Sequence, residues 1–332
     1  MVSLSNKLGL STSSLGLHPS HTLDQKILAA AQYGFEGIEV VYGDLETYSN
    51  LNNFSMYAGA EKIRQLCENN RVSIIALVPF ENFEGTKTPL QDRLAVAALW
   101  IEIARVLRAT YIQVPAQYNP ECIGDESVIV SELQKLADLA SASSPVISIA
   151  YEPMSWSIHY STWESSLQLA SLVNRSNFGI CLDTFHIITK LWASPFEPSG
   201  QYPNGSQALT DSLRRAVTQL AKEKLFYVQL SDGERFDPPF SQAHPWYVEG
   251  EAPEFTWSKN ARPFPLETEY GGYLPVPEAL HAWLVDKKFT GWVSFESFDR
   301  RMRDASFKPE TGAARARNSW NKLQMLEGES KL

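Results

Sequence analysis

The sequence lacks several features that would assign it to large classes of protein. Its three cysteines, Cys67, Cys122 and Cys181, form no Cys-x-x-Cys motif, which is typical of reduced thiols in a cytosolic protein. The opening segment, Met1–Lys7, lacks the basic stretch and long apolar run of a signal peptide. No window approaches the roughly 18 apolar residues of a membrane helix. We therefore expect a cytoplasmic protein with no membrane partner.

Basic charge is also scarce. The chain has 29 Lys and Arg against 38 Asp and Glu, which gives a formal net charge of −9 and an isoelectric point near 5.3. This balance argues against a nucleic-acid partner and suits a protein that binds small molecules or cations. The sequence has no Walker loop, no Gly-x-Ser-x-Gly elbow and no strand-linked dinucleotide fingerprint. NTPases, serine-triad hydrolases and NAD enzymes are thereby set aside.

A repeated pattern fills the 332 residues: a short apolar run, a polar or proline-bearing turn and a helical segment. The apolar runs predict strands, and the amphipathic stretches between them predict helices. The predicted strands are Leu8–Thr12, Gly37–Tyr42, Val72–Val78, Tyr111–Pro115, Val146–Tyr151, Phe178–Leu182, Leu225–Leu230 and Trp292–Phe295. The predicted helices include Leu23–Tyr33, Ala58–Asn69, Asp92–Arg108, Ser127–Ser141 and Thr162–Val173.

This alternation of strands and helices predicts the fold class. Parallel strands need a crossover connection, so alternating elements indicate an α/β protein with a parallel sheet. Eight such units predict a (β/α)₈ TIM barrel in a single domain over residues 1–332, with an open doubly wound sheet as the alternative. The connections after strands six and seven, at about residues 184–224 and 231–289, are expected to be long loops above the mouth. They would act as lids or binding walls, or else as a surface flap or dimer contact.

The last four predicted strands each end in a polar residue, namely Glu152, Asp183, Gln229 and Glu296. In a barrel, such residues converge over the axis. Three carboxylates in one cleft would repel one another unless they took up protons or shared a cation. We therefore predict one divalent metal ion held by these four residues. Oxygen ligands favour Mg²⁺ or Mn²⁺ and leave Zn²⁺ or Co²⁺ open. The alternative is that these side chains cap helices at the strand-to-helix turns.

Three further residues are candidates for catalysis. His186 follows Asp183 by three residues, so it is expected near the metal as a general base or a substrate contact rather than as a structural histidine. His244 and Arg262 lie on the connection after strand seven. Both are predicted to close over the substrate.

Six segments carry a family resemblance: Thr110–Ala116, Tyr151–Glu152, Asn177–Phe185, Phe226–Gln229, Trp257–Arg262 and Gly291–Phe298. They resemble the fungal 3-dehydroshikimate dehydratases, within the xylose isomerase-like barrel superfamily that also contains sugar isomerases and epimerases. The resemblance covers about residues 6–325 and is most specific in the second half of the chain. It implies the same four metal ligands, a histidine at His186 and a substrate-binding arginine at Arg262.

The resemblance also implies a reaction. In such enzymes the metal holds the carbonyl or enolate oxygen while a base removes the proton next to it, and loss of the β-hydroxyl as water gives protocatechuate. The leading interpretation is therefore a metal-dependent lyase that acts on a small-molecule substrate. A sugar isomerase or epimerase on the same scaffold, a divergent member with another substrate and a non-catalytic ligand-binding barrel are the alternatives. Homo-oligomer formation is left open.

One position departs from the family pattern. Members carry a Phe-Arg-x-aromatic-Glu-Gly segment after strand three, whose arginine is expected to meet the substrate carboxylate. This chain has Phe-Glu81-Asn-Phe-Glu-Gly instead. A carboxylate in place of a cation removes an attraction and adds a repulsion, worth on the order of a few kcal/mol in a desolvated site. Either Lys87, Lys259 or Arg262 compensates, or the substrate is a different one.

Overall fold

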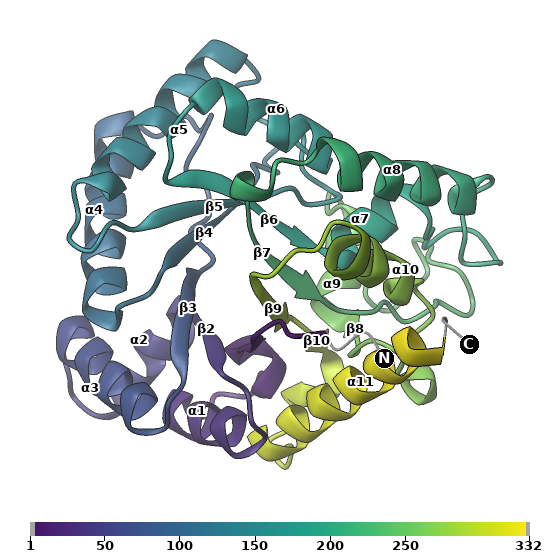
Figure 1. Cartoon of the computed structure of the whole chain (residues 1–332), viewed down its shortest axis with the longest axis horizontal. Helices are drawn as coiled ribbons and strands as arrows, with labels where there is room; N and C mark the ends of the chain where they lie inside the picture. Colours follow the sequence, from purple (N-terminus) through teal and green to yellow (C-terminus); the bar gives the residue numbers. More distant parts are fainter. Residues whose placement is uncertain (1–3, 330–332) are drawn as a thin grey trace.

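A closed barrel of parallel strands lies at the centre of the computed structural model, which describes residues 4–329 (Figure 1). Each strand pairs with the next in the chain, and the last returns to pair with the first. The (β/α)₈ prediction is confirmed. The barrel strands are β1 (Leu8–Ser11), β2 (Gly37–Val41), β3 (Ser73–Val78), β4 (Tyr111–Pro115), β5 (Ser148–Glu152), β6 (Phe178–Asp183), β7 (Leu225–Leu230) and β9 (Trp292–Phe295).

Helices form the outer ring around these strands (Figure 1). Local sequence signals set several of their ends: Asp125 accepts hydrogen bonds from the first-turn N–H groups of one helix, and Thr162 forms a capping box with Ser165 in the next. The helices are α1 (Leu23–Gln32), α2 (Tyr42–Leu51), α3 (Met56–Asn69), α4 (Leu90–Leu107), α5 (Glu126–Ser141), α6 (Trp163–Val173), α7 (Thr184–Leu191), α8 (Gly205–Gln219), α9 (Pro253–Asn260), α10 (Val276–Leu280) and α11 (Pro309–Glu329). None of the described helices is long and apolar enough to cross a bilayer.

The interior of the barrel changes character along its axis. Side chains at alternate strand positions point inward, and one inner group consists of Ile75, Ala150, Cys181 and Tyr227, which pack together with their neighbours. Gly9 has to remain small, because a Cβ atom built on it would lie 2.3 Å from Cδ1 of Ile75. Two residues further along β5, β6 and β7 the inward positions are polar. This register places a polar layer above an apolar floor.

The connection after β6 is more regular than predicted. Asp183 ends β6, and its Oδ1 accepts a hydrogen bond from the N–H of Phe185, so α7 starts at once. Helices α7 and α8 take up much of residues 184–224, where a long loop was expected. The expectation missed the apolar face that α8 buries through Leu209 and Leu213.

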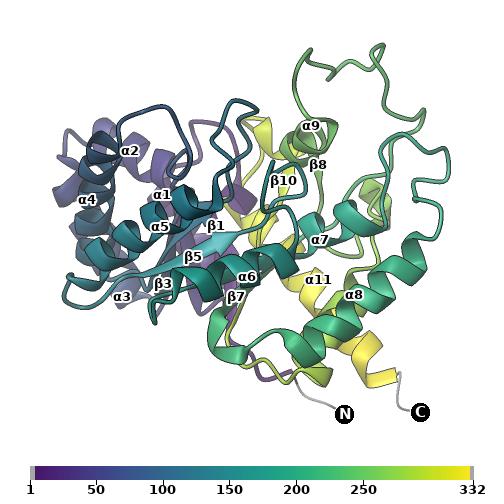
Figure 2. The same cartoon turned by 90° about the horizontal axis from the view of Figure 1, so that it is seen from above.

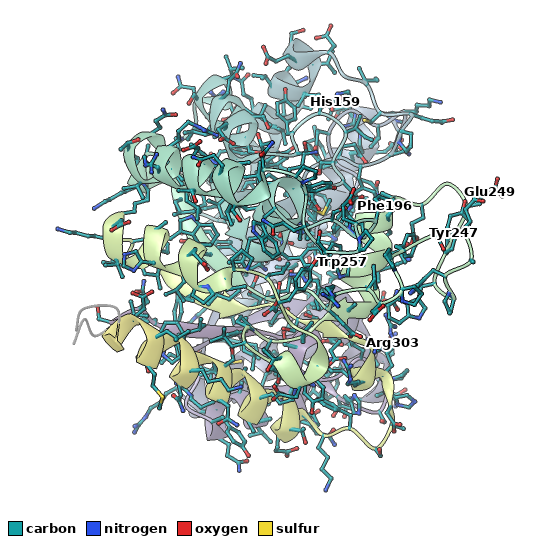
Figure 3. All side chains as sticks on the ribbon, turned by 90° about the vertical axis from the view of Figure 1, so that its right-hand side faces the viewer. His159, Phe196, Tyr247, Glu249, Trp257 and Arg303 are labelled. Atoms are coloured by element: carbon teal, nitrogen blue, oxygen red, sulfur yellow. The ribbon has the colours of Figure 1, made fainter. Side chains whose placement is uncertain are left out.

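The connection after β7 does contain a long irregular segment, at residues 231–252, which precedes α9. After α9, the two-residue strand β8 (Ala261–Arg262) pairs in antiparallel fashion with β10 (Phe298–Asp299). Part of the irregular segment projects beyond the barrel (Figure 2), and Figure 3 shows Tyr247 and Glu249 on that projection. The β8–β10 pairing, in contrast, places Arg262 next to the segment that follows Glu296.

Candidate active site

A cavity of about 500 Å³ opens where the barrel strands end. Residues at the ends of β2, β3, β4 and β5 line it, as do α1, α2 and α9. Glu152, His186, Arg262 and Glu296 line it, and so does Lys26 of α1. The position matches the mouth at which barrel enzymes place their active sites.

Four carboxylates are buried in the polar layer of the barrel: Glu39, Glu152, Asp183 and Glu296. Burial is the largest influence on each of them and favours the neutral form. It raises the pKa of Glu39 to about 7 and that of Glu296 to about 8. Burial and the charge of Glu296 together raise the pKa of Glu152 well above its usual range. The pKa of Asp183 is also raised by burial, although Arg262 opposes the shift.

Arg262 is the cation at the centre of this group. Its Nη2 donates to Oδ2 of Asp183 and lies 3.3 Å from Oε2 of Glu296. Nε and Nη2 both donate to the hydroxyl of Ser231, at 3.1 and 2.8 Å, and Nη1 donates to Ser258 at 3.1 Å. The guanidinium also lies over the rings of Phe185 and Phe298, at 4.7 and 5.0 Å. Arg262 is therefore a fixed, fully buried part of the carboxylate cluster.

Glu152 is held on one side only. Nε2 of Gln113 on β4 donates to its Oε2 at 2.5 Å, whereas Oε1 has no hydrogen-bond partner among the described residues. This oxygen lies 3.6 Å from Nε2 of His186, which is 3.9 Å from Oδ2 of Asp183. Ligand atoms of Glu152, Asp183 and His186 lie within 4.8 Å of one another.

These residues fit a divalent cation. Arg262 pairs with two of the four buried carboxylates, Asp183 and Glu296. A buried anionic oxygen without a partner is unfavourable unless a proton or a cation binds to it. Oxygen donors at this density are typical of sites for hard divalent ions. A cation near Oε1 of Glu152 would supply the interaction that the described protein groups do not.

Gln229 lies in the same layer but faces another neighbour. Its backbone pairs with Asp183 in the sheet, while its Nε2 donates to Oε2 of Glu39 at 2.9 Å. Its Oε1 accepts from the Cys181 thiol at 3.2 Å. The structure thus brings Glu152, Asp183 and Glu296 together around Arg262 and His186, and it links the Gln229 amide to Glu39.

His186 is buried on α7, directly beside the carboxylates. Burial, and then the charge of Arg262, lower its pKa well below the usual value, so the ring is neutral. The backbone N–H of Ser155 donates to Nδ1 at 3.3 Å, which leaves the proton of the neutral ring on Nε2. Trp156 packs edge-on against the ring, with centroids 4.7 Å apart. The Nε2–H group of His186 therefore lies near the carboxylates of Glu152 and Asp183, at 3.6 and 3.9 Å, but forms no hydrogen bond to either.

The structure also places His244, which was predicted to close over the substrate, and Glu81, which departs from the family pattern. His244 sits in an aromatic cluster with Phe236, Phe240 and Trp246, and it is not part of the cavity lining. Glu81 does line the cavity, but it is exposed and accepts a hydrogen bond from the hydroxyl of Tyr118 at 2.8 Å.

Two functional candidates escaped the sequence-based prediction. Glu39 and Gln113 occupy inward positions of β2 and β4 and contact Gln229 and Glu152, respectively. The signal was a polar residue inside an otherwise apolar run, Gly-Ile-Glu39-Val-Val and Tyr-Ile-Gln113-Val-Pro. A polar side chain in a strand covered on both faces has to point into the barrel, where it needs a partner.

Comparison with known proteins agrees with this architecture. The model of the family described as "Xylose isomerase-like TIM barrel" matches residues 27–323. The chain belongs to this family. A curated relative, the 3-dehydroshikimate dehydratase of Neurospora crassa, is 38% identical over 96% of this chain and 93% of its own length. The resemblance to the fungal dehydratases is thereby confirmed.

Solved structures with lower identity share the fold. A xylose isomerase-like TIM barrel/4-hydroxyphenylpyruvate dioxygenase fusion protein matches with a TM-score of 0.75 and 23% identity, over 98% of this chain and 44% of that one. The IolI protein with a bound zinc atom matches with a TM-score of 0.66 and 18% identity, over 96% and 97% of the two chains.

Proposed function

We propose that this protein is a metal-dependent 3-dehydroshikimate dehydratase, a lyase that converts 3-dehydroshikimate to protocatechuate and water. The observation that carries the proposal is the 38% identity to the Neurospora crassa dehydratase along nearly the whole of both chains. The buried cluster of carboxylates at the strand ends supports it, because such a cluster would hold a divalent cation, and a cation stabilises the negative charge that develops on oxygen when a proton next to a ketone is removed.

The proposal includes one divalent ion, with Glu152, Asp183, Gln229 and Glu296 as its ligands; Gln229 would have to release its contacts with Glu39 and Cys181 to bind the ion. Oxygen ligands favour Mg²⁺ or Mn²⁺. When bound, the ion would act as a Lewis acid that polarises the ketone of the substrate. Arg262 would keep Asp183 and Glu296 in position, because its guanidinium bonds to both. Gln113 would do the same for Glu152.

His186 would act on the substrate through its Nε2–H group. A neutral imidazole can donate a hydrogen bond to a carbonyl oxygen and stabilise the charge that develops there. The contact from the Ser155 N–H to Nδ1 supports this role over that of a base, since it keeps the proton on Nε2. Trp156 and Phe255, whose rings contact each other in the cavity wall, would exclude water from this region.

The direct test is the appearance of the ultraviolet absorbance of protocatechuate when the Mn²⁺-loaded protein is mixed with 3-dehydroshikimate. Sustained turnover that stops on chelation is expected. If no protocatechuate forms with any of Mg²⁺, Mn²⁺, Co²⁺ or Zn²⁺, the dehydratase proposal is wrong. Ketohexoses assayed in parallel test the epimerase alternative, which would interconvert sugars without loss of water.

A charge reversal at Glu81 tests how strongly that residue opposes an acidic substrate. Because Glu81 is exposed, water and salt screen its charge. We therefore expect Glu81→Arg to lower KM for 3-dehydroshikimate by about two- to tenfold, with little change in kcat. Steady-state kinetics at two salt concentrations would measure the effect, which should shrink at high salt.

The matched control for this change is Glu121→Arg. Glu121 is exposed, pairs with Lys87 at 2.7 Å and does not line the cavity. The Glu121→Arg substitution changes the net charge by the same amount as Glu81→Arg, but at a position outside the cavity. Its KM should therefore stay close to that of the native protein. If Glu81→Arg abolishes turnover while Glu121→Arg does not, Glu81 has a positive role in the reaction.

A further inference from the structure

The cavity continues beyond the carboxylate cluster to a second wall. Thr22, Leu23 and Lys26 of the α1 end and Asp44 and Thr47 of α2 line this part. Helix α2 begins directly after β2, and α1 follows β1 after a short 3-10 turn and a loop, so both N-termini lie on the side of the barrel where the strands end, as do Glu152 and Glu296. One ligand in this cavity can therefore meet both walls.

The lysines and the arginine that line the cavity differ in their free hydrogen-bonding capacity. Among the described lining residues these are Lys26, Lys259 and Arg262. Arg262 already donates to two carboxylates and two hydroxyls. The Lys259 side chain is 38% exposed and pairs with Glu251 at 2.7 Å, so solvent screens its charge.

Lys26 is the buried cation of the three that keeps free donors. The residue is only 2% exposed. Its Nζ donates to Oδ2 of Asp44 at 2.8 Å and has no other hydrogen bond to a described residue. An ammonium group carries three donors, so two N–H groups remain in a desolvated wall. A buried ammonium gains much more from an additional anionic partner than an exposed one does.

The first turn of α1 adds to this preference. The earliest intrahelical bond runs from the N–H of Lys26 to the carbonyl of Thr22, and the Thr22 side chain caps none of the N–H groups before it. Free N–H groups and the helix dipole both favour an anion at such an end. Thr22 and Leu23, which begin this turn, line the cavity together with Lys26.

We propose that Lys26 and the first turn of α1 bind the carboxylate of the substrate while its ketone end faces Glu152, Glu296 and His186. This inference rests on the proposed function, because it places a ring acid in the cavity. It also explains how an acidic substrate can bind although Glu81 replaces the arginine of the family pattern. The cation that binds the carboxylate comes from α1 instead of the segment after β3. Asp44 lines the same part of the cavity and pairs with Lys26 at 2.8 Å, so its carboxylate competes with the ligand for the ammonium group.

The test compares a ligand that carries the carboxylate with one that lacks it. Protocatechuate and catechol share the same diol, so the ratio of their dissociation constants reports on recognition of the carboxylate. We expect the Mn²⁺-loaded protein to prefer protocatechuate by tenfold or more in isothermal titration calorimetry, about the contribution of one hydrogen bond between charged groups. Lys26→Met should reduce this preference by about tenfold. Catechol affinity should stay the same.

Asp44→Asn is the matched variant. It breaks the same ion pair as Lys26→Met, but it leaves the ammonium in place and removes the competing anion. The preference for protocatechuate should therefore be kept or increased. If both variants lose the preference equally, the pair only supports the fold, and the inference is wrong. Thermal unfolding and circular dichroism check that each variant is folded, and Lys26→Gln replaces Lys26→Met if the latter does not fold.

Two other results would overturn the inference: equal affinity of the native protein for both ligands, or loss of the preference in Lys259→Met with Lys26→Met unaffected. Its failure can be told apart from failure of the proposed function. If the protein turns over 3-dehydroshikimate but Lys26→Met leaves the ligand preference unchanged, the dehydratase proposal stands and the inference about Lys26 is wrong. If the protein does not turn over 3-dehydroshikimate but Lys26→Met loses the preference for protocatechuate, the carboxylate site stands and the dehydratase proposal is wrong.

Discussion

Removal of divalent metal is expected to lower the rate of 3-dehydroshikimate dehydration by about 10³-fold or more, and Mn²⁺ or Mg²⁺ is expected to restore it. The size follows from the several kcal/mol that a Lewis acid contributes when charge develops on oxygen. Within the protein, Arg262 pairs with only two of the four buried carboxylates, Asp183 and Glu296. The measurement is the initial rate of protocatechuate formation after dialysis against a chelator, with residual metal determined by elemental analysis.

The same loss is expected from Asp183→Asn, because the substitution removes a charge from the proposed ligand set. The matched control is Asp232→Asn, which changes a second buried aspartate two residues after the end of β7. Four backbone N–H groups donate to the Asp232 carboxylate, at distances between 2.7 and 3.1 Å. Since loop backbone rather than a cation satisfies this group, Asp232→Asn should retain its metal content, although it should lower the melting temperature.

These measurements separate the metal proposal from a purely structural role of the cluster. Full activity in protein shown to be free of metal would contradict the proposed chemistry. A metal content that is normal in Asp183→Asn but reduced in Asp232→Asn would place the ion at a different group of residues.

The sequence predicts the fold well because the relevant signal is repeated and local. Each strand of the barrel reads as an apolar run bounded by turn residues, and the eight runs lie within a few residues of the eight strands. The residues Glu152 and Asp183 end their strands. Since parallel strands in a barrel share one carboxyl edge, their convergence follows from topology alone.

The sequence does not predict which partner each polar side chain chooses. The link from Gln229 to Glu39 joins residues 190 positions apart, and the central place of Arg262 depends on the pairing of β8 with β10. Such two-residue strands carry no periodicity. The buried pair of Lys26 and Asp44 was hidden for a similar reason: Lys26 lies in an amphipathic helix, where a lysine normally indicates the solvent-facing side.

Replacement of His186 by alanine is expected to lower kcat by about 10²-fold or more while metal content stays unchanged. Loss of one preorganised hydrogen-bond donor in an active site costs about that much. The ring is neutral, and the Ser155 N–H occupies Nδ1. Nε2 therefore carries the proton and offers no lone pair to a cation.

His186→Gln distinguishes the two roles that the residue can have in the reaction, because a glutamine amide can donate an N–H from about the position of Nε2 but cannot act as a base. If His186 donates a hydrogen bond, kcat of His186→Gln should exceed that of His186→Ala by about tenfold. Equal, low rates in two variants that both retain metal would instead make His186 the base. If both variants lose metal and activity together, His186 is a metal ligand, which its proximity to Glu152 and Asp183 permits. A rate close to that of the native protein in His186→Ala would leave the histidine with a structural role only.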